Sequence, residues 1–387
     1  MYKILTLNNI SPKGLDQFGH EHYEVASEMS QPDAIMVRSA NMHDMDIPGS
    51  LKAVGRAGAG VNNIPIDAMS ERGVAVFNAP GANANAVKEM VLAGMLLAAR
   101  NIPQAWDYAR QLEGDDASVH KQVEAGKKKY AGFELPSRTL GVVGLGAIGV
   151  QVANAARLLG MRVVGYDPHM TVNRAWQLNA GVEQAVSVDD LLNRCDMVTF
   201  HIPLNDHTRH LINSDRLHNM KRGSVVLNFA RDEIVDEQAV LAALASGQLH
   251  AYVCDFPSNG LKGQDRVIAL PHLGASTSEA EENCAIMVGE QLRDYLENGN
   301  VRNSVNLPEV ILPRAGKSRL AVMNRNRPDM VGQISHVLGQ SNINIVHMVN
   351  ESRNGIAYNL IDVEDEIDEE AARGIAGIDG VLRVRVL

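Results

Sequence analysis

Short apolar runs alternate with longer, helix-like stretches along the first 300 residues. In residues 1–100 the runs Tyr2 to Leu7, Ala34 to Val37, Lys52 to Val54 and Val74 to Phe77 read as buried strands, and Lys88 to Arg100 as a strongly apolar helix. Continuous apolar runs separated by helices are typical of a parallel sheet that is covered on both faces. The first part of the chain therefore predicts an α/β domain.

A second series of the same kind follows a polar connector at residues 126–137. Its strand-like runs are TLGVVGLG, RVVGYDP, DMVTFHIP, SVVLNFA and VIALPH. Each run is followed by a helical stretch, which predicts a second doubly wound, Rossmann-like sheet.

The pattern changes near Asn298, where Gly, Asn and Pro residues indicate a linker. From Ser318 the order strand, helix, strand, strand, helix, strand predicts a separate ferredoxin-like βαββαβ domain. We therefore expect two Rossmann-like domains, with the active site in the cleft between them, and a small C-terminal domain. The expected boundaries are 1–97 with 274–300 for a substrate-binding domain, 98–273 for a nucleotide-binding domain, 301–317 for a linker and 318–387 for the C-terminal domain.

Composition narrows the class of function. The formal net charge is -10, which argues against general nucleic-acid binding because a nucleic-acid surface must neutralise phosphates. No apolar run approaches a membrane span, and the first residues read as a strand rather than a signal peptide. The three cysteines, Cys195, Cys254 and Cys284, lack metal-ligand spacing. We expect a cytoplasmic protein with reduced thiols and no metal site.

One motif predicts a dinucleotide. The segment Gly144-Leu145-Gly146-Ala147-Ile148-Gly149 follows an apolar strand and opens a helix. Gly144 permits a tight turn, Gly146 lets the backbone approach a pyrophosphate, and Gly149 permits close packing of helix on strand. Asp167 ends the next strand, where its carboxylate can accept hydrogen bonds from a ribose and would repel a 2′-phosphate. The cofactor expected is NAD rather than NADP.

Two residues are suited to the oxidation of a 2-hydroxy acid. His272 is a candidate base for the hydroxyl proton, and Arg231 is a candidate cation for the carboxylate. Both lie at expected strand ends of the nucleotide-binding domain. On spacing alone, however, a surface or core histidine and a solvated arginine remain open readings.

Longer segments add a resemblance. Residues 1–300 resemble the D-isomer-specific 2-hydroxyacid dehydrogenase family. The segments that carry it are GRAGAGVNNI (55–64), FNAPGANANAVKE (77–89), GVVGLGAIG (141–149), HIPLNDHT (201–208), NFARDEIVDEQAVLAALASGQ (228–248) and VIALPHLGAST (267–277). They are long and occur in the family's order. By this resemblance Arg231 orients the substrate carboxylate and His272 is the acid–base.

The resemblance also implies cofactor contacts and one departure. Asp255 matches the residue that binds the nicotinamide carboxamide, Pro203 and Thr208 match cofactor-contact positions, and Ala230 lies beside the nicotinamide. The family pairs the catalytic histidine with a glutamate. Here Asn259 falls where that glutamate belongs, so the partner of the histidine is in doubt.

The substrate implied is phosphorylated. Arg56 matches a residue that holds the anionic substrate, and Gly58 lies beside it in a loop whose backbone can approach an anion. Arg38 ends an expected strand near the same place. The run from Lys127 to Lys129 reads instead as a solvated connector. The resemblance implies NAD-dependent oxidation of D-3-phosphoglycerate to 3-phosphooxypyruvate, the first step of L-serine biosynthesis.

The last 70 residues resemble an ACT domain, a module that binds amino acids. Within NRNRPDMVGQISHVLGQSNINI (324–345), Asn326 and Asn344 match positions that hold L-serine, and Asn324 stands where a related enzyme has histidine. The alternative is that these residues only form turns. The resemblance implies feedback regulation by serine and a homodimer or homotetramer. Two further alternatives are an enzyme of the hydroxypyruvate or glyoxylate reductase type and a non-enzymatic NAD-binding regulator.

Overall fold

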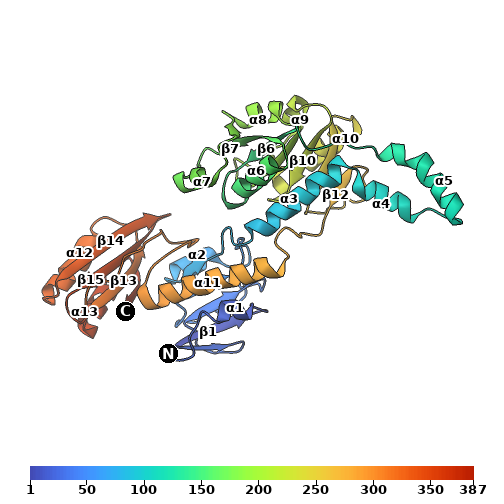
Figure 1. The fold of residues 1–387 in the computed structure, drawn as a ribbon. Coiled ribbons are helices and arrows are strands. Elements are labelled where there is room, and N and C mark those ends of the chain that lie inside the picture. The colour runs from blue at the N-terminus through green and yellow to red at the C-terminus, as the bar shows by residue number, and fades with distance from the viewer. The chain divides into compact units, whose positions relative to one another are not determined.

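The computed structural model describes all 387 residues, which form two compact units. Unit 1 comprises Met1–Asn83 and Ser278–Leu387, and unit 2 comprises Ala84–Thr277. Each unit contains one parallel sheet, as the two series of apolar runs predict (Figure 1). No helix of the structure combines the length and the apolar character that crossing a membrane requires.

The parallel sheet of unit 1 has five strands in the order β2-β1-β3-β4-β5. Its strands are β1 (Tyr2–Leu7), β2 (Tyr23–Ala26), β3 (Ala34–Val37), β4 (Ala53–Arg56) and β5 (Ala75–Phe77), and its helices are α1 (Pro12–Leu15), α2 (Ile66–Glu71) and α11 (Ser278–Asn298). Strands β3 and β5 are buried at every position, as their apolar runs predict. The strand β2 was not expected, because it is a short edge strand in which Tyr23 alone is buried.

The long helix α11 packs closely on this sheet because residue 55 is glycine. A Cβ atom at Gly55 would collide with Val288 and lie 2.9 Å from a methyl carbon of Leu292. The helix also begins beside the carboxyl ends of the strands, since Glu281 in its first turn forms an ion pair with Arg38, next to the end of β3.

The C-terminal residues form the expected βαββαβ element. It consists of β13 (Ser318–Arg325), α12 (Met330–Gln340), β14 (Ile345–Arg353), β15 (Ile356–Val363), α13 (Glu369–Ala376) and β16 (Val381–Val386). The antiparallel order β14-β15-β13-β16 confirms the ferredoxin-like prediction. The fold class predicted from the sequence is therefore correct.

This antiparallel sheet has two buried faces, which differs from the expected separate domain. Along β13, Leu320 and Val322 pack with α12 and α13, whereas Ala321 and Met323 join the core of the parallel sheet. The segment expected as a linker is also packed, since the Val305 N–H donates to the carbonyl of Val76. The C-terminal sheet and the N-terminal sheet consequently belong to one compact unit.

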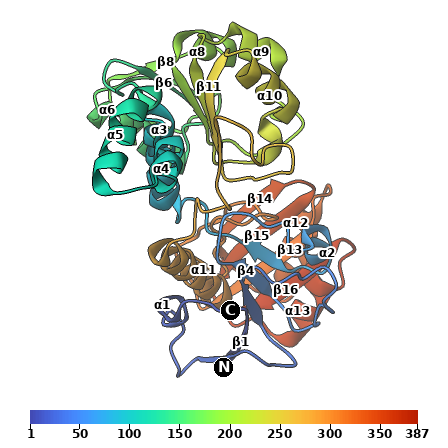
Figure 2. The same ribbon diagram turned by 90° about the vertical axis from the view of Figure 1, so that its right-hand side faces the viewer.

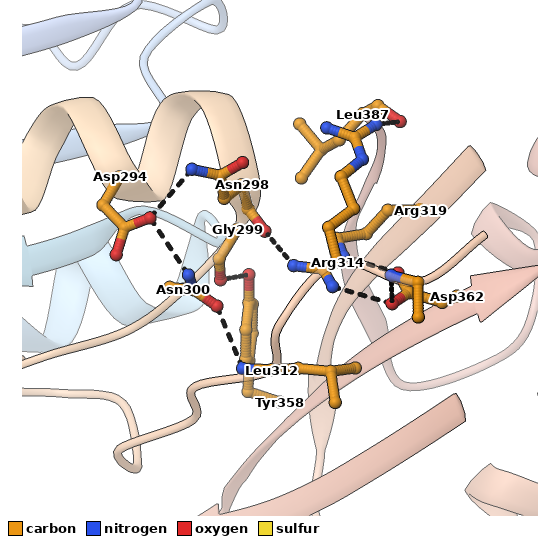
Figure 3. Close-up of polar contacts among 11 residues, drawn as sticks. Asp294, Asn298, Gly299, Asn300, Leu312, Arg314, Arg319, Tyr358, Asp362 and Leu387 are labelled. Carbon is orange, nitrogen blue, oxygen red and sulfur yellow. Dashed lines mark hydrogen bonds and ion pairs between the residues drawn. The ribbon is translucent and has the colours of Figure 1, made fainter. Parts of the chain in front are cut away.

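Polar contacts join the C-terminal sheet to the end of α11 (Figure 3). The last carbonyls of a helix lack partners within it. Here Arg319 Nη1 donates to the carbonyl of Asn298 at 3.0 Å, and the Tyr358 hydroxyl donates to the carbonyl of Gly299 at 2.7 Å. Arg319 also donates to both oxygens of Asp362, at 2.6 and 2.7 Å. The C-terminal sheet thus supplies the missing donors at this end of the helix.

Unit 2 contains a seven-stranded parallel sheet in the order β12-β11-β10-β9-β6-β7-β8. Its strands are β6 (Thr139–Val143), β7 (Arg162–Tyr166), β8 (Val182–Gln184), β9 (Met197–Phe200), β10 (Ser224–Asn228), β11 (Leu249–Cys254) and β12 (Val267–Ala269). Its helices are α3 (Ala84–Ala99), α4 (Ile102–Arg110), α5 (Asp116–Gly126), α6 (Ala147–Leu158), α7 (Val172–Gln177), α8 (Val188–Arg194), α9 (Ser214–Asn219) and α10 (Glu237–Ala245), with 3-10 turns at Lys127–Tyr130 and Asp232–Ile234. Five of these strands were expected from the sequence, and β8 and β11 were not. Helices α9 and α10 lie on one face and α3 and α6 on the other (Figure 2).

Unit 2 begins with helix α3. It packs on β10, β11 and α6, with Gly94 so close to Leu227 and Phe229 that an added Cβ would lie 3.2 Å from each. The compact unit therefore starts at Ala84, whereas the expected boundary, at residues 97 and 98, falls within the last turn of this helix.

Candidate active site and cofactor site

The strand order of unit 2 reverses between β6 and β9, and the residues after these strands face one another there. In doubly wound sheets ligands bind outside the carboxyl ends of the strands at such a reversal. Gly144 follows β6 and His201 follows β9. The predicted glycine motif therefore lies where the topology favours a dinucleotide.

Each glycine of the motif has a distinct structural role. Gly144 has a φ of 89°, and a Cβ there would lie 2.6 Å from the carbonyl oxygen of His201. A Cβ at Gly149 would collide with the Gly144 carbonyl oxygen, so α6 packs directly on the turn. Around Gly146, in contrast, no atom lies within 4 Å of such a Cβ. That open space at the start of α6 fits a pyrophosphate on the helix N-terminus.

Asp167 stands at the end of β7 and organises the same turn. Its Oδ2 accepts from the Leu145 N–H and its Oδ1 from the His169 N–H, both at 2.8 Å. It lines a cavity of about 300 Å³ together with Gly165, Met170 and Leu178. A carboxylate at the rim of a partly apolar cavity fits the ribose and base of an adenosine.

The other predicted cofactor residues of unit 2 lie on two loops and in the first turn of α6, at this edge of the sheet. The Thr208 hydroxyl donates to the carbonyl of Pro203 at 2.7 Å and closes the loop after β9. Ala230 is buried in the loop after β10. Ala147 and Ile148 form the first turn of α6.

Arg231 is exposed, and buried Asn228 holds its loop. The Asn228 amide donates to the carbonyl of Arg231 at 2.8 Å and accepts from the Ala230 N–H at 3.2 Å. Arg231 Nη1 also donates to the Ala230 carbonyl at 2.6 Å. Asn228 was not among the predicted residues. The signal available in the sequence was an asparagine at the end of the apolar run Ser224 to Leu227.

His272 has a strained backbone and an exposed imidazole. Its φ is 52°, in the left-handed region that non-glycine residues seldom adopt. Its N–H donates to the carbonyls of Leu270, at 3.0 Å, and Asp255, at 3.1 Å. The ring lies edge-on to Phe256 with centroids 5.2 Å apart. Strain of this kind concentrates at functional sites.

Asp255 is a buried acidic residue whose backbone carbonyl accepts from the His272 N–H. It is 2% exposed, its Oδ2 accepts from the Gly274 N–H at 3.1 Å, and its Oδ1 has no partner. Burial raises the pKa of Asp255, while the Gly274 N–H and the charges of His272 and Arg231 oppose that rise. The structure thus brings Asp255, His272 and Arg231 into one electrostatic group. The unpaired Oδ1 fits the amide donor of a nicotinamide.

Asn259 does not take part in this group. It is exposed and forms no hydrogen bond with His272. The carboxyl group close to His272 belongs instead to Asp255, which was predicted as a nicotinamide contact and comes directly after β11.

The predicted substrate residues of unit 1 lie together. Arg56 Nε donates to the carbonyl of Arg38 at 3.0 Å. A Cβ at Gly58 would collide with the guanidinium of Arg56, so the glycine leaves room for that side chain. Arg38 forms an ion pair with Glu281, an acidic neighbour that was not predicted, because it lies 243 residues along the chain.

The three predicted effector residues do not lie together in one chain. Asn324 is fully buried: its Oδ1 accepts from Asn359 at 2.7 Å and its amide donates to the carbonyl of Arg325 at 2.8 Å. Asn326 follows the end of β13, whereas Asn344 lies at the other end of the sheet, bonded to Glu364. An eight-residue strand spans roughly 25 Å.

Comparison with known proteins identifies the nucleotide-binding region. Residues 92–274 match the family model "D-isomer specific 2-hydroxyacid dehydrogenase, NAD binding domain". The chain is 35% identical over 349 residues to the D-3-phosphoglycerate dehydrogenase of Haemophilus influenzae, covering 87% of this chain and 81% of that protein. It is 35% identical over 335 residues to the enzyme of the same name from Methanocaldococcus jannaschii, covering 84% of this chain. The chain spans 61% of the length of that archaeal protein.

Solved structures of enzymes that are named for different substrates share this fold. An apo D-mandelate dehydrogenase from Rhodotorula graminis matches with a TM-score of 0.67 and 26% identity, over 81% of this chain and 99% of that one. An NAD+-bound 3-phosphoglycerate dehydrogenase from Entamoeba histolytica matches with a TM-score of 0.61 and 25% identity, over 79% and 98%. The fold is therefore one that binds NAD, but it does not identify the 2-hydroxy acid, which depends on the side chains of the site.

Proposed function

The chain belongs to the D-isomer specific 2-hydroxyacid dehydrogenase family, and we propose that it oxidises D-3-phosphoglycerate to 3-phosphooxypyruvate with NAD. The observation that carries the proposal is the electrostatic group formed by Asp255, His272 and Arg231, which follow β11, β12 and β10 at the same edge of the sheet as the glycine turn after β6. The names of its relatives in Haemophilus and Methanocaldococcus support the substrate. In this role the chain catalyses the first step of L-serine biosynthesis.

The residues of the group divide the chemistry between them. The imidazole of His272 takes the proton of the C2 hydroxyl, while the Arg231 guanidinium binds the carboxylate and attracts the C2 oxygen as it becomes a carbonyl. NAD, when bound, supplies the acceptor for the hydride that leaves C2. The carboxylate of Asp255 stabilises the imidazolium that forms. Gly146 and Asp167 hold the pyrophosphate and ribose of the cofactor.

The phosphate and the effector require further residues. Arg56 and Arg38 supply positive charge for the substrate phosphate. The assembly is a homodimer or homotetramer, and serine binds where Asn326 of one copy meets Asn344 of another. This arrangement is consistent with the positions of the two residues at opposite ends of one sheet. Serine binding slows turnover in this proposal.

The test is NADH formation from D-3-phosphoglycerate, with and without millimolar L-serine. His272→Ala should reduce kcat by at least about a hundredfold, because general-base catalysis is worth about that much or more. His218→Ala, a histidine in α9 outside the group, should leave the rate unchanged. A panel with hydroxypyruvate and glyoxylate tests the reductase alternative. NAD binding without turnover of any 2-hydroxy acid would favour the regulator alternative.

A further inference from the structure

A carboxylate stands beside the two arginines to which the phosphate is assigned. Glu281, in the first turn of α11, accepts from Arg38 Nη2, and the two side chains are 41% and 38% exposed. Both groups are therefore accessible to a ligand in water. A pair of this kind exchanges partners at little cost, because exposed ion pairs are weak.

The two arginines and the glutamate form one cluster. Val37, the last residue of β3, is in register with Arg56, the last residue of β4, so Arg38 and Arg56 leave the same edge of the sheet. Arg56 Nε donates to the Arg38 carbonyl. Cys284, one turn further along α11, is buried, and burial raises its pKa while the charges of Arg56 and Arg38 oppose the rise. The Arg38 guanidinium therefore lies against the helix that carries Glu281, and Arg56 is bonded to the backbone of Arg38.

We propose that Glu281 is a specificity-determining residue that lowers the preference of the site for a phosphorylated 2-hydroxy acid over an unphosphorylated one. The inference rests on the proposed function, in which Arg38 and Arg56 receive the phosphate. Its basis is the position of Glu281 on Arg38, within the same cluster.

The charges of the groups explain the effect. Arg38 and Arg56 are both positively charged, and Glu281 neutralises the charge of Arg38. A phosphate monoester carries about −1.5 to −2 at neutral pH, so it is repelled by Glu281 and competes with it for Arg38. An unphosphorylated substrate such as D-glycerate lacks that group. The glutamate therefore penalises D-3-phosphoglycerate more than it penalises D-glycerate.

The variant Glu281→Gln isolates this charge. Glutamine keeps an oxygen that accepts from Arg38, so the position of the arginine is retained while the repulsion is removed. We expect kcat/KM for D-3-phosphoglycerate to rise about tenfold, mainly through KM, and kcat/KM for D-glycerate to change less than about twofold. The gain should shrink at high salt, where exposed charges are screened. Arg38→Gln should instead raise KM for D-3-phosphoglycerate.

The neighbouring residue gives a matched control. Glu282→Gln removes the same charge from the same turn, but Glu282 pairs with Lys13 rather than with an arginine of the cluster. It should leave the ratio of the two kcat/KM values unchanged. A wild type that oxidises D-3-phosphoglycerate, with the same ratio in Glu281→Gln, overturns the role of Glu281 alone. A wild type that oxidises neither compound overturns the proposed function and this inference together.

Discussion

Two arginine–carboxylate pairs, one near each end of α11, differ in their exposure and in their hydrogen bonding. At its start, Arg38 and Glu281 are each more than a third exposed. Past its end, Arg319 and Asp362 are fully buried between the strands β13 and β15. The same two chemical groups therefore serve different purposes. The exposed pair can exchange partners with a ligand, whereas the buried pair is part of the structure.

Hydrogen bonding explains why the buried pair is tolerated. Burying two charges is costly unless their donors and acceptors are satisfied. Arg319 donates from Nε and Nη2 to the two oxygens of Asp362 and from Nη1 to the Asn298 carbonyl. Asp362 Oδ2 also accepts from the Ala315 N–H at 2.8 Å. Removing one partner leaves the other charged, buried and without its main partner.

The largest expected effect is therefore on this buried pair. Arg319→Met should lower the free energy of unfolding by about 3–5 kcal/mol, the usual cost of an uncompensated buried charge. The double variant Arg319→Met/Asp362→Leu should recover much of the loss, since two apolar groups pack without an unpaired charge. Thermal unfolding of the full chain, followed by circular dichroism, measures both. If Arg319→Met were as stable as the wild type, the pair would contribute nothing to the free energy of unfolding.

The contrast also explains which features could be predicted from the sequence. Apolar runs and the glycine turn depend on residues close together in the chain, so both parallel sheets, the βαββαβ order and the glycine motif with Asp167 followed from local patterns. Strands β2, β8 and β11 were missed. Of these, β2 and β8 are short, and Tyr23 is the one buried residue that they contain.

Features that depend on distant residues could not be predicted in the same way. Asp362 lies 43 residues from Arg319, and Glu281 lies 243 residues from Arg38, so no spacing signals either pair. The burial of Asn324 followed from its neighbours across the sheet rather than from its loop-like sequence context. The packing of the C-terminal sheet on the N-terminal core was missed for the same reason.

A second effect concerns pH and acts on the buried pair alone. Burial would raise the pKa of Asp362, but hydrogen bonds from Arg319 and the Ala315 N–H and the charges of nearby arginines outweigh it, so its pKa is lowered. A carboxyl group whose folded pKa lies below its unfolded value of about 3.9 stabilises the fold above that value. This stability is lost as the pH falls from about 4 through the lowered folded pKa.

Melting temperatures measured from pH 5 downward test this. The wild type should lose more stability on acidification than Arg319→Met/Asp362→Leu, which lacks the titrating group. The loss should be smaller than that caused by Arg319→Met, because a protonated Asp362 still accepts hydrogen bonds. Parallel pH curves for the two proteins would show that Asp362 contributes nothing to the acid sensitivity.

The smallest expected effect is on the exposed pair. Glu281→Gln and Arg38→Gln should each change the free energy of unfolding by no more than about 1 kcal/mol, because water solvates either partner when the other is lost. The same unfolding measurement as for Arg319→Met provides the comparison. A loss of several kcal/mol in Glu281→Gln would show that this pair is structural as well, and a change in substrate preference could then follow from a displaced α11. If stability stays within this limit while the substrate preference changes, the charge of Glu281 acts on the ligand and not through the fold.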